Sequence, residues 1–300
     1  MSREEEPDPL WESPIVLAAT PIGNLADATD RLKQLISTAD IIACEDTRRT
    51  RHLIHALGLS TAARLVSLHE HNEASRAAQL VEQAETGARV LVVSDAGMPA
   101  VSDPGFRIAA AAIGADIGLT VAPGASAVTT ALAVSGLGTD RFTFAGFIPR
   151  KQSERAGLVE RLRTEEWTTV LFDSPRRIAE NVAELAAALG ENRQAAVARE
   201  LTKKFEEVLR GSLGELAAEL TQRSEAGLKG EFVLVLAGTS AGDRPGEPTP
   251  TAEELAGTVL ERAAAGERLK AAAKDVGAAH RVPASELYDA AVALRRRREP

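Results

Sequence analysis

The chain of 300 residues carries a formal net charge of −8, with 44% hydrophobic but only 3% aromatic residues. This length favours about two domains, and aliphatic side chains must fill their cores because aromatic residues are so few. The single cysteine, Cys44, excludes an intrachain disulfide. No apolar run approaches the roughly 20 residues of a membrane span. The first nine residues are acidic and lack the apolar stretch of a signal peptide, so we expect a cytoplasmic protein with no membrane partner.

Apolar runs alternate with amphipathic stretches in the first half of the chain. We predict strands at residues 15–19, 41–43, 65–68, 90–94 and 119–121. We predict helices between them at residues 28–38, 47–56, 74–85 and 106–114, and a closing helix at 126–134. This alternation is typical of a parallel sheet with helices on both faces.

A glycine-rich break from Ser135 to Thr139 is the best domain boundary, so we expect an N-terminal domain over 14–136 and a second over 139–238. The second domain has predicted strands at 142–147, 168–172, 195–199, 206–211 and 231–237. Its predicted helices are 153–164, 178–189 and 213–225. Short connections between the later strands favour a mixed sheet, so the fold class is α/β in both domains.

Residues 239–250 are polar and proline-containing and are interpreted as a linker. A helical module is expected over 251–300, with helices at 252–265, 269–276 and 284–298. Thr251 and Glu254 have the spacing of a capping box at the first of these helices. The overall negative charge argues mildly against non-specific nucleic-acid binding. From Arg268 onward, however, eight basic residues, including Arg295–Arg298, stand against four acidic ones.

Three loops follow predicted strands and contain glycine or proline. They are Thr20–Leu25, Ser94–Gly105 and Pro123–Ala127. Ligands of open α/β sheets bind beyond the carboxyl ends of the strands, and the third loop opens a helix whose free N–H groups suit an acceptor. An ordinary strand-to-helix turn, with Ser126 as N-cap, is an equally simple interpretation. The chain has no G-x-G-x-x-G or Walker motif and no metal-spaced Cys/His cluster, so we expect no metal.

Seven ordered motifs resemble those of the ribosomal small-subunit (16S) rRNA (cytidine-2′-O)-methyltransferase family. In chain order they are Ala19–Leu25, Cys44–Arg48, His69–Glu73, Ser94–Gly105, Pro123–Ala127, Gly146–Lys151 and Phe172–Arg177. The resemblance covers roughly residues 15–238. It implies two α/β domains of the tetrapyrrole methylase type with S-adenosylmethionine between them, commonly as a homodimer. It also implies 2′-O-methylation of a cytidine in the decoding region of 16S rRNA, with the C-terminal helices as an RNA-binding module.

The same resemblance implies the residues that bind the cofactor. They are Pro21, Ser94, Asp95, Gly97 and Met98, then Ser126 and Ala127, and Ser174 and Gly211 from the second domain. The family usually has threonine at the position of Met98. A hydroxyl contact is therefore lost there, although backbone contacts remain available.

The ribose hydroxyl is a weak nucleophile and needs a base or water to take its proton. Glu45, Asp46, His69 and His71 are candidates for that base, and Arg48 and Lys151 complete the catalytic candidates. Each has a structural alternative: Asp46 is well placed to cap the following helix, the histidines to serve a structural role, and Lys151 to be an ordinary surface charge.

Cations near the implied cofactor site and in the C-terminal module are candidates for contacts to 16S rRNA in the small ribosomal subunit. They are Arg150, Arg176, Arg177, Lys270, Lys274 and Arg295. Two other functions remain open. A tetrapyrrole methyltransferase usually opens with Gly-x-Gly-Pro-Gly-Asp, where this chain has Thr20–Asn24, and it lacks a basic tail. A non-catalytic ribosome assembly factor would keep the pocket without the chemistry.

Overall fold

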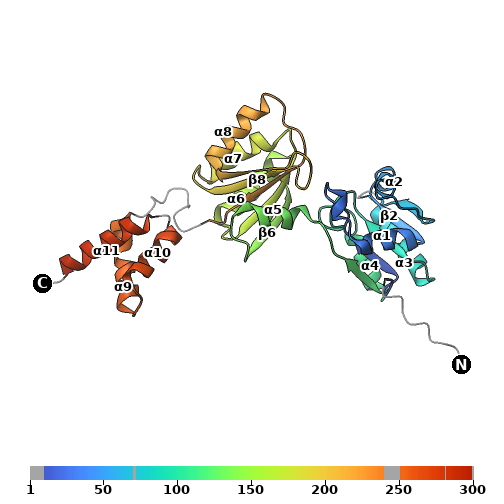
Figure 1. Cartoon of the computed structure of the whole chain (residues 1–300), viewed down its shortest axis with the longest axis horizontal. Helices are drawn as coiled ribbons and strands as arrows, with labels where there is room; N and C mark the ends of the chain where they lie inside the picture. Colours follow the sequence, from blue (N-terminus) through green and yellow to red (C-terminus); the bar gives the residue numbers. More distant parts are fainter. Residues whose placement is uncertain (1–9, 70–71, 240–250, 281, 299–300) are drawn as a thin grey trace. The chain divides into compact units, whose positions relative to one another are not determined.

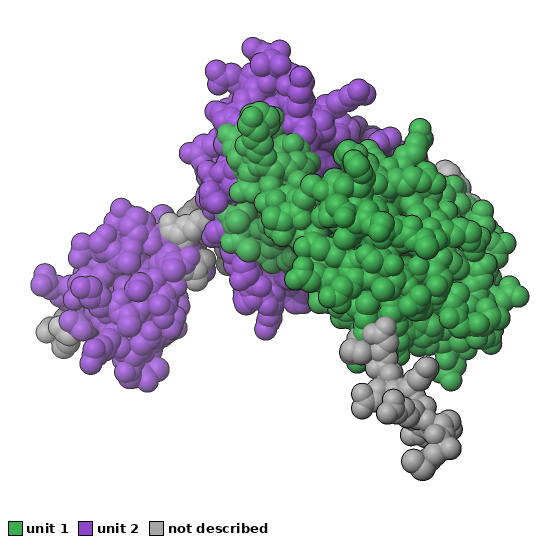
Figure 2. Space-filling model, turned by 45° about the vertical axis from the view of Figure 1, so that its right-hand side comes forward, with its two compact units in different colours: residues 1–134, 198–207 green, residues 135–197, 208–300 purple. Residues whose placement is uncertain are grey.

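A computed structural model describes residues 10–69, 72–239, 251–280 and 282–298 (Figure 1). The chain forms two compact units, coloured separately in Figure 2. The first unit runs to Val134 and also contains Ala198–Glu207, and the second contains Ser135–Val197 and the residues from Val208 onward. Apart from Thr239, the predicted linker at 239–250 lies outside the described residues.

The described strands of the first unit form one parallel sheet, as the alternating pattern predicts. They are β1 (Ile15–Ala18), β2 (Ile41–Cys44), β3 (Arg64–Ser67), β4 (Val90–Val93) and β5 (Leu119–Ala122), in the order β3-β2-β4-β1-β5. β1 lies between β4 and β5, with Ile15 opposite both Val90 and Leu119. The strands are short apolar runs because helices cover both faces of the sheet.

Helices α1 (Asp30–Thr38) and α2 (Thr47–Ala56) pack on one face, and α3 (Glu73–Glu85) and α4 (Phe106–Gly114) on the other. Successive strand residues serve opposite faces: Val16 packs in the cluster of Leu32 from α1, whereas Ile15 packs in the cluster of Leu80 from α3. A 3₁₀ turn, η1 (Leu25–Asp27), precedes α1. The helix starts at Asp30 rather than at residue 28 because the Thr29 hydroxyl accepts the Leu32 N–H at 3.1 Å and caps it.

The second sheet is mixed, as predicted. Its strands are β6 (Phe142–Phe147), β7 (Thr168–Asp173), β8 (Gln194–Arg199), β9 (Glu207–Ser212) and β10 (Phe232–Leu236), in the order β6-β7-β10-β8-β9. β6 pairs parallel with β7, whereas β10 pairs antiparallel with it. Helices α6 (Gln152–Thr164), α7 (Ile178–Leu189) and α8 (Leu213–Ser224) share one core with the sheet.

The described part of the C-terminal region is helical. It contains α9 (Ala252–Ala264), α10 (Leu269–His280) and α11 (Ala284–Arg298), which bury a small aliphatic core of their own. The predicted capping box at Thr251 and Glu254 is present. α10 continues to His280 instead of ending at residue 276. Gly277 lies within this longer helix, and glycine suits the position because a Cβ there would lie 2.6 Å from the Val282 carbonyl oxygen.

None of the described helices has the length and apolar character needed to span a bilayer.

Candidate active site

The loops that the sequence singles out meet at one edge of the first sheet. All five strands run in the same direction, so the segments that follow β1, β2, β4 and β5 emerge together at the carboxyl end. Pro21 lies after β1, Ser94 to Met98 after β4, and Ser126 just before α5 (Ala127–Ser135). The cofactor candidates of the first unit therefore share one edge of its sheet.

Two of these loops are joined by a short antiparallel bridge. The Thr20 N–H donates to the Gly97 carbonyl at 2.9 Å, and the Gly97 N–H donates back to the Thr20 carbonyl at 3.0 Å. The Ser94 hydroxyl also donates to the Gly97 carbonyl at 2.9 Å. Gly97 has a φ of +83°, and a Cβ there would lie 3.3 Å from Ile22. Glycine therefore allows the two loops to form one fixed backbone platform.

The third loop lies close to the first. A Cβ on Gly124 would lie 3.0 Å from the Cβ of Ala19. Ser126 precedes α5 directly, and its backbone carbonyl accepts the Thr130 N–H at 3.0 Å. The approach of Gly124 to Ala19 brings the N-terminal end of α5 toward the platform. Backbone N–H groups at such an end suit a polar or anionic ligand.

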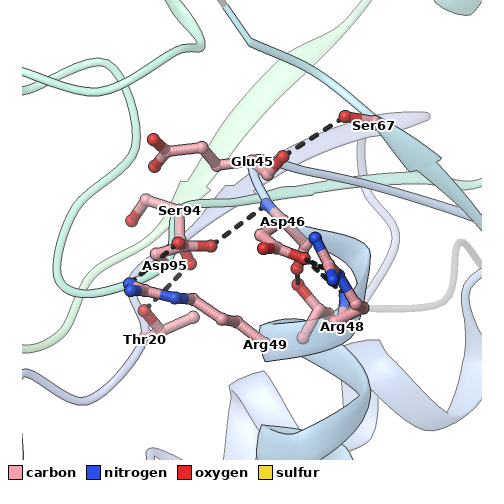
Figure 3. Close-up of polar contacts among 9 residues, drawn as sticks. Thr20, Glu45, Asp46, Arg48, Arg49, Ser67, Ser94 and Asp95 are labelled. Atoms are coloured by element: carbon pink, nitrogen blue, oxygen red, sulfur yellow. Dashed lines mark hydrogen bonds and ion pairs between the residues drawn. The ribbon is translucent and has the colours of Figure 1, made fainter.

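Asp95 connects the second loop to the start of α2. Its Oδ1 accepts the Asp46 N–H at 3.1 Å, and its Oδ2 forms an ion pair with Arg49 at 3.1 Å (Figure 3). The Asp95 side chain is 15% exposed, whereas that of Arg49 is 72% exposed. A charge-assisted contact to a largely buried carboxylate is of the stronger kind. Asp95 therefore holds the second loop against the start of α2.

Asp46 caps α2, which is the structural alternative that the sequence left open. Its carboxylate accepts the Arg48 N–H at 2.7 Å. That hydrogen bond, together with the nearby arginine charge, lowers the pKa of Asp46. A carboxylate that is engaged and weakly basic is a poor choice for taking a proton. Arg48 is 88% exposed and points to the other side of the helix start from Arg49 (Figure 3).

Three acidic groups influence one another at this edge. Burial, followed by the charge of Asp95, raises the pKa of Glu45. Burial, followed by the charges of Glu45 and Asp95, raises the pKa of Asp103 to about 7. Asp103 lies in the second loop, directly after Ser102, whose φ is +62°. A carboxyl group with a pKa near neutrality suits proton transfer.

Asp103 is the candidate that sequence reasoning missed. Its position in the Asp-Pro-Gly of the second loop marks a turn, not a titrating group. The effect of the Glu45 and Asp95 charges on its pKa depends on how the segments after β2 and β4 meet, and no local sequence signal reports that.

Of the two histidine candidates, the structure describes His69. His69 is exposed after β3, and its backbone N–H donates to the Asn72 side chain at 2.9 Å. His71 lies outside the described residues. Glu73, which the second loop approaches, is buried and accepts the N–H groups of Gly105 and Arg107 at the start of α4.

The candidates of the second unit lie around the end of β7 and the start of α6. Arg177 forms an ion pair with the buried Asp173 at 2.9 Å and donates to the Ile148 carbonyl at 3.0 Å. Its side chain also approaches the Ser174 hydroxyl at 3.3 Å. These contacts give Arg177 a structural role, whereas Arg176 is exposed. RNA contact by either residue and cofactor contact by Ser174 stay predictions.

The remaining candidates of the second unit are at its surface or at a strand end. Arg150 is exposed, and Lys151 forms an exposed ion pair with Glu154 at 3.0 Å. Gly211 lies near the end of β9, directly before the Ser212 that caps α8.

In the C-terminal module, Lys270 and Lys274 are exposed on α10 and Arg295 is exposed on α11. Within the described ranges, no group of three or more His, Cys, Asp or Glu side chains is placed to hold a metal ion.

Comparison with known proteins places these features in a family. The family model described as Tetrapyrrole (Corrin/Porphyrin) Methylases matches residues 14–217. A relative from Mycobacterium tuberculosis (strain CDC 1551 / Oshkosh), named Ribosomal RNA small subunit methyltransferase I, is 45% identical over 283 residues, which cover 94% of this chain and 95% of the relative. A relative of the same name from Halalkalibacterium halodurans is 38% identical over 275 residues, covering 92% and 93%.

Solved structures show the same fold at lower identity. The crystal structure of uroporphyrin-III-C-methyltransferase from Thermus thermophilus superposes with a TM-score of 0.52 at 20% identity, covering 74% of this chain and 93% of that one. This similarity bears on the fold alone.

Proposed function

The chain belongs to the tetrapyrrole methylase family and, within it, to the ribosomal RNA small subunit methyltransferases I, and we propose that it methylates 16S rRNA with S-adenosylmethionine. We propose the 2′-oxygen of a cytidine ribose in the decoding region as the acceptor. The observation that carries the rRNA methyltransferase activity is the 45% identity to a named rRNA methyltransferase over nearly the whole of both chains. The acceptor atom is proposed from the resemblance of the seven sequence motifs.

The loop platform of the first unit fits the methyl donor. Gly97 and Gly124 pack closely against Ile22 and Ala19 and leave little room for a side chain, so the three loops lie close together at this edge. Pro21, Ser94, Asp95, Gly97 and Met98 would hold the cofactor there, together with Ser126 and Ala127. We propose Ser174 and Gly211 of the second unit as further cofactor-binding residues. Bound there, the cofactor supplies a methyl group on a positively charged sulfur.

Asp103 and Glu45 are the groups best suited to handle the ribose proton. The hydroxyl becomes a useful nucleophile only as its proton leaves. Asp103, with a pKa of about 7, is largely ionised slightly above neutral pH and can accept that proton. Glu45, whose pKa is also raised, is the second candidate for the base. Asp46 is the third, because its carboxylate accepts the Arg48 N–H and its pKa is lowered. Arg48 and Lys151 are better suited to phosphate contacts than to proton transfer.

RNA contacts are proposed for exposed cations of the second unit and of the helical module. These are Arg150, Lys151, Arg176, Lys270, Lys274 and Arg295, with Arg177 as a positioning residue held by Asp173. We also propose a cytoplasmic homodimer that acts on the small ribosomal subunit.

The proposed reaction is tested by methyl transfer from tritiated S-adenosylmethionine to small subunits that lack this modification. We expect label at one ribose-methylated cytidine after nuclease digestion. Label on an added tetrapyrrole but not on RNA would instead assign the chain to the small-molecule branch of its fold. Cofactor binding without transfer to either would indicate an assembly factor.

Removal of the C-terminal module is expected to weaken RNA binding and leave cofactor binding unchanged. The module buries a core that shares no residue with the cores of the two sheets, so we expect both sheets to fold without it. Each lost phosphate contact makes the dependence of the logarithm of the RNA association constant on the logarithm of the salt concentration less steep, by roughly 0.7 for single-stranded RNA. Binding of residues 1–239 and of the full chain to small subunits at several salt concentrations measures the effect.

Calorimetry with S-adenosylmethionine is the control, because equal cofactor affinity shows that the truncated chain is folded. Equal RNA affinity for the two proteins would contradict the role of the module.

A further inference from the structure

Helix α2 carries an exposed stripe of basic side chains. Arg48 lies three residues before Arg51 and four before His52, and His55 lies four residues after Arg51 and three after His52, so all four share one face of the helix. All four are exposed, and α2 contains no acidic residue. The opposite face buries Thr50 and Ile54. We call these four residues the α2 stripe.

The fold itself gains little from this stripe. Arg48 and Arg51 lie in the N-terminal half of α2, where the helix dipole disfavours positive charge. Arg48 has a loose contact of 3.7 Å with Asp46. Within the described part of the chain, the side chains of Arg51, His52 and His55 make no hydrogen bond or ion pair. An uncompensated basic face on a chain of net charge −8 is suited to an anionic partner.

A hollow of about 440 Å³ lies at the far end of the stripe. Its lining combines two basic side chains, two hydroxyls and an aliphatic floor, and consists of Arg51, Ile54, His55, Leu59, Ser60, Thr61, Ala63 and Leu65. This volume is in the range of small-molecule sites. Single-stranded RNA is bound by this combination: cations and hydroxyls hold phosphates, and apolar, imidazole or guanidinium surfaces take the face of a base.

The stripe begins next to the candidate active site. The N-cap Asp46 donates its N–H to Asp95, and Arg48 is two residues further along. From Arg48 to His55 the helix rises roughly 10 Å. A strand that leaves the site along α2 therefore meets Arg48 first and then Arg51, which lines the hollow.

We propose that the α2 stripe holds the phosphates of single-stranded RNA beside the target nucleotide and that the hollow takes one flanking nucleotide. This inference rests on the proposed RNA substrate. An RNA strand is favoured over an acidic protein segment because the hollow joins aliphatic side chains, which can take the face of a base, to the Arg51 guanidinium and the hydroxyls of Ser60 and Thr61.

The test compares Arg51→Glu with Arg161→Glu. Both arginines are exposed on helices, and neither side chain has a hydrogen bond or ion pair among the described residues. A carboxylate at residue 51 suits the N-terminal half of α2, so the variant is expected to fold. Binding of a labelled single-stranded RNA of mixed sequence is measured by anisotropy at several salt concentrations. Methyl transfer to small subunits and cofactor affinity are measured in parallel.

We expect Arg51→Glu to raise the Kd for the RNA and the KM for small subunits about tenfold. The salt slope should fall by at least 0.7, roughly one phosphate contact, with cofactor affinity and kcat unchanged. Arg161→Glu should change none of these. An equal effect of both variants, or none from Arg51→Glu, would overturn the inference, as would an effect on small subunits without one on protein-free RNA. The proposed function fails separately, if the unaltered protein transfers no methyl group to RNA.

Discussion

Replacement of Asp103 by asparagine is expected to lower the rate constant of methyl transfer by about 100-fold or more at pH 8. Asparagine keeps the size of the side chain but cannot take the proton of the ribose hydroxyl, and a positioned base contributes roughly 10²–10⁴-fold. The pKa of Asp103 is about 7 because the group is buried near Glu45 and Asp95. In the unaltered protein, the rate should therefore rise with pH through about 7. Single-turnover measurements from pH 5.5 to 8.5 give both the rate and its inflection.

The same substitution is expected to stabilise the fold at alkaline pH. Asp103 has a folded-state pKa above its unfolded value of about 3.8. The folded chain therefore binds more protons between pH 4 and pH 7, and this group makes the unaltered protein lose stability as the pH rises through that window. Asparagine carries no charge and avoids the loss. We expect the free energy of unfolding to rise by about 2 kcal/mol at pH 8 and to change little at pH 4. This value is lower than 1.36 kcal/mol for each pKa unit would give, because Asp103 is partly exposed.

Two further variants separate the alternatives. Asp116→Asn removes a carboxylate from the loop before β5, at the opposite edge of the sheet, and should change neither rate nor stability profile. Glu45→Gln removes a negative charge that raises the pKa of Asp103, so it should move the inflection of the rate to lower pH. Full loss of transfer in Glu45→Gln, with transfer retained in Asp103→Asn, would identify Glu45 as the base and refute the role of Asp103.

The fold of the first unit could be predicted because its sequence signals are local. Runs such as Val90–Val93 are apolar on both faces, and the amphipathic stretches between the strands have helical spacing. Once the strands are parallel, the loops at Pro21, Ser94 and Ser126 must emerge at one edge. The association of Ala198–Glu207 with the first unit could not be predicted, because it depends on contacts between residues far apart in the chain.

The site was harder to predict where its residues act through partners distant in sequence. Asp103 resembles a turn residue until burial and the charges of Glu45 and Asp95 give it an unusual pKa. Arg177 resembles an RNA contact, but its ion pair with Asp173 depends on the turn between β7 and α7, which the spacing of the two residues does not report. The cap at Asp46 is the converse case, since the local pattern predicted it and the structure confirms it.

Replacement of Asp95 by alanine is expected to raise the dissociation constant for S-adenosylmethionine about tenfold to 100-fold. The change leaves the Asp46 N–H without its acceptor and Arg49 without its carboxylate. Hydrogen bonds to charged groups contribute roughly 1.5–3 kcal/mol, and their loss loosens the segment from Ser94 to Met98 that we propose holds the cofactor. Calorimetry with S-adenosylmethionine or S-adenosylhomocysteine measures the change directly.

Asp40→Ala provides a matched control at the other end of the sheet. Asp40 also accepts a backbone N–H, that of Arg89 at 2.8 Å, and also pairs with an arginine, Arg89, at 3.1 Å. Because Asp40 precedes β2 and Arg89 precedes β4, this tie lies away from the loop platform. Its loss should leave cofactor affinity unchanged.

The dissociation constant of Asp95→Asn for S-adenosylmethionine should lie between those of Asp95→Ala and the unaltered protein. The amide oxygen of asparagine still accepts the Asp46 N–H but carries no charge to pair with Arg49. Equal weakening in Asp40→Ala would trace the effect to general destabilisation, and unchanged affinity in Asp95→Ala would remove Asp95 from the cofactor site.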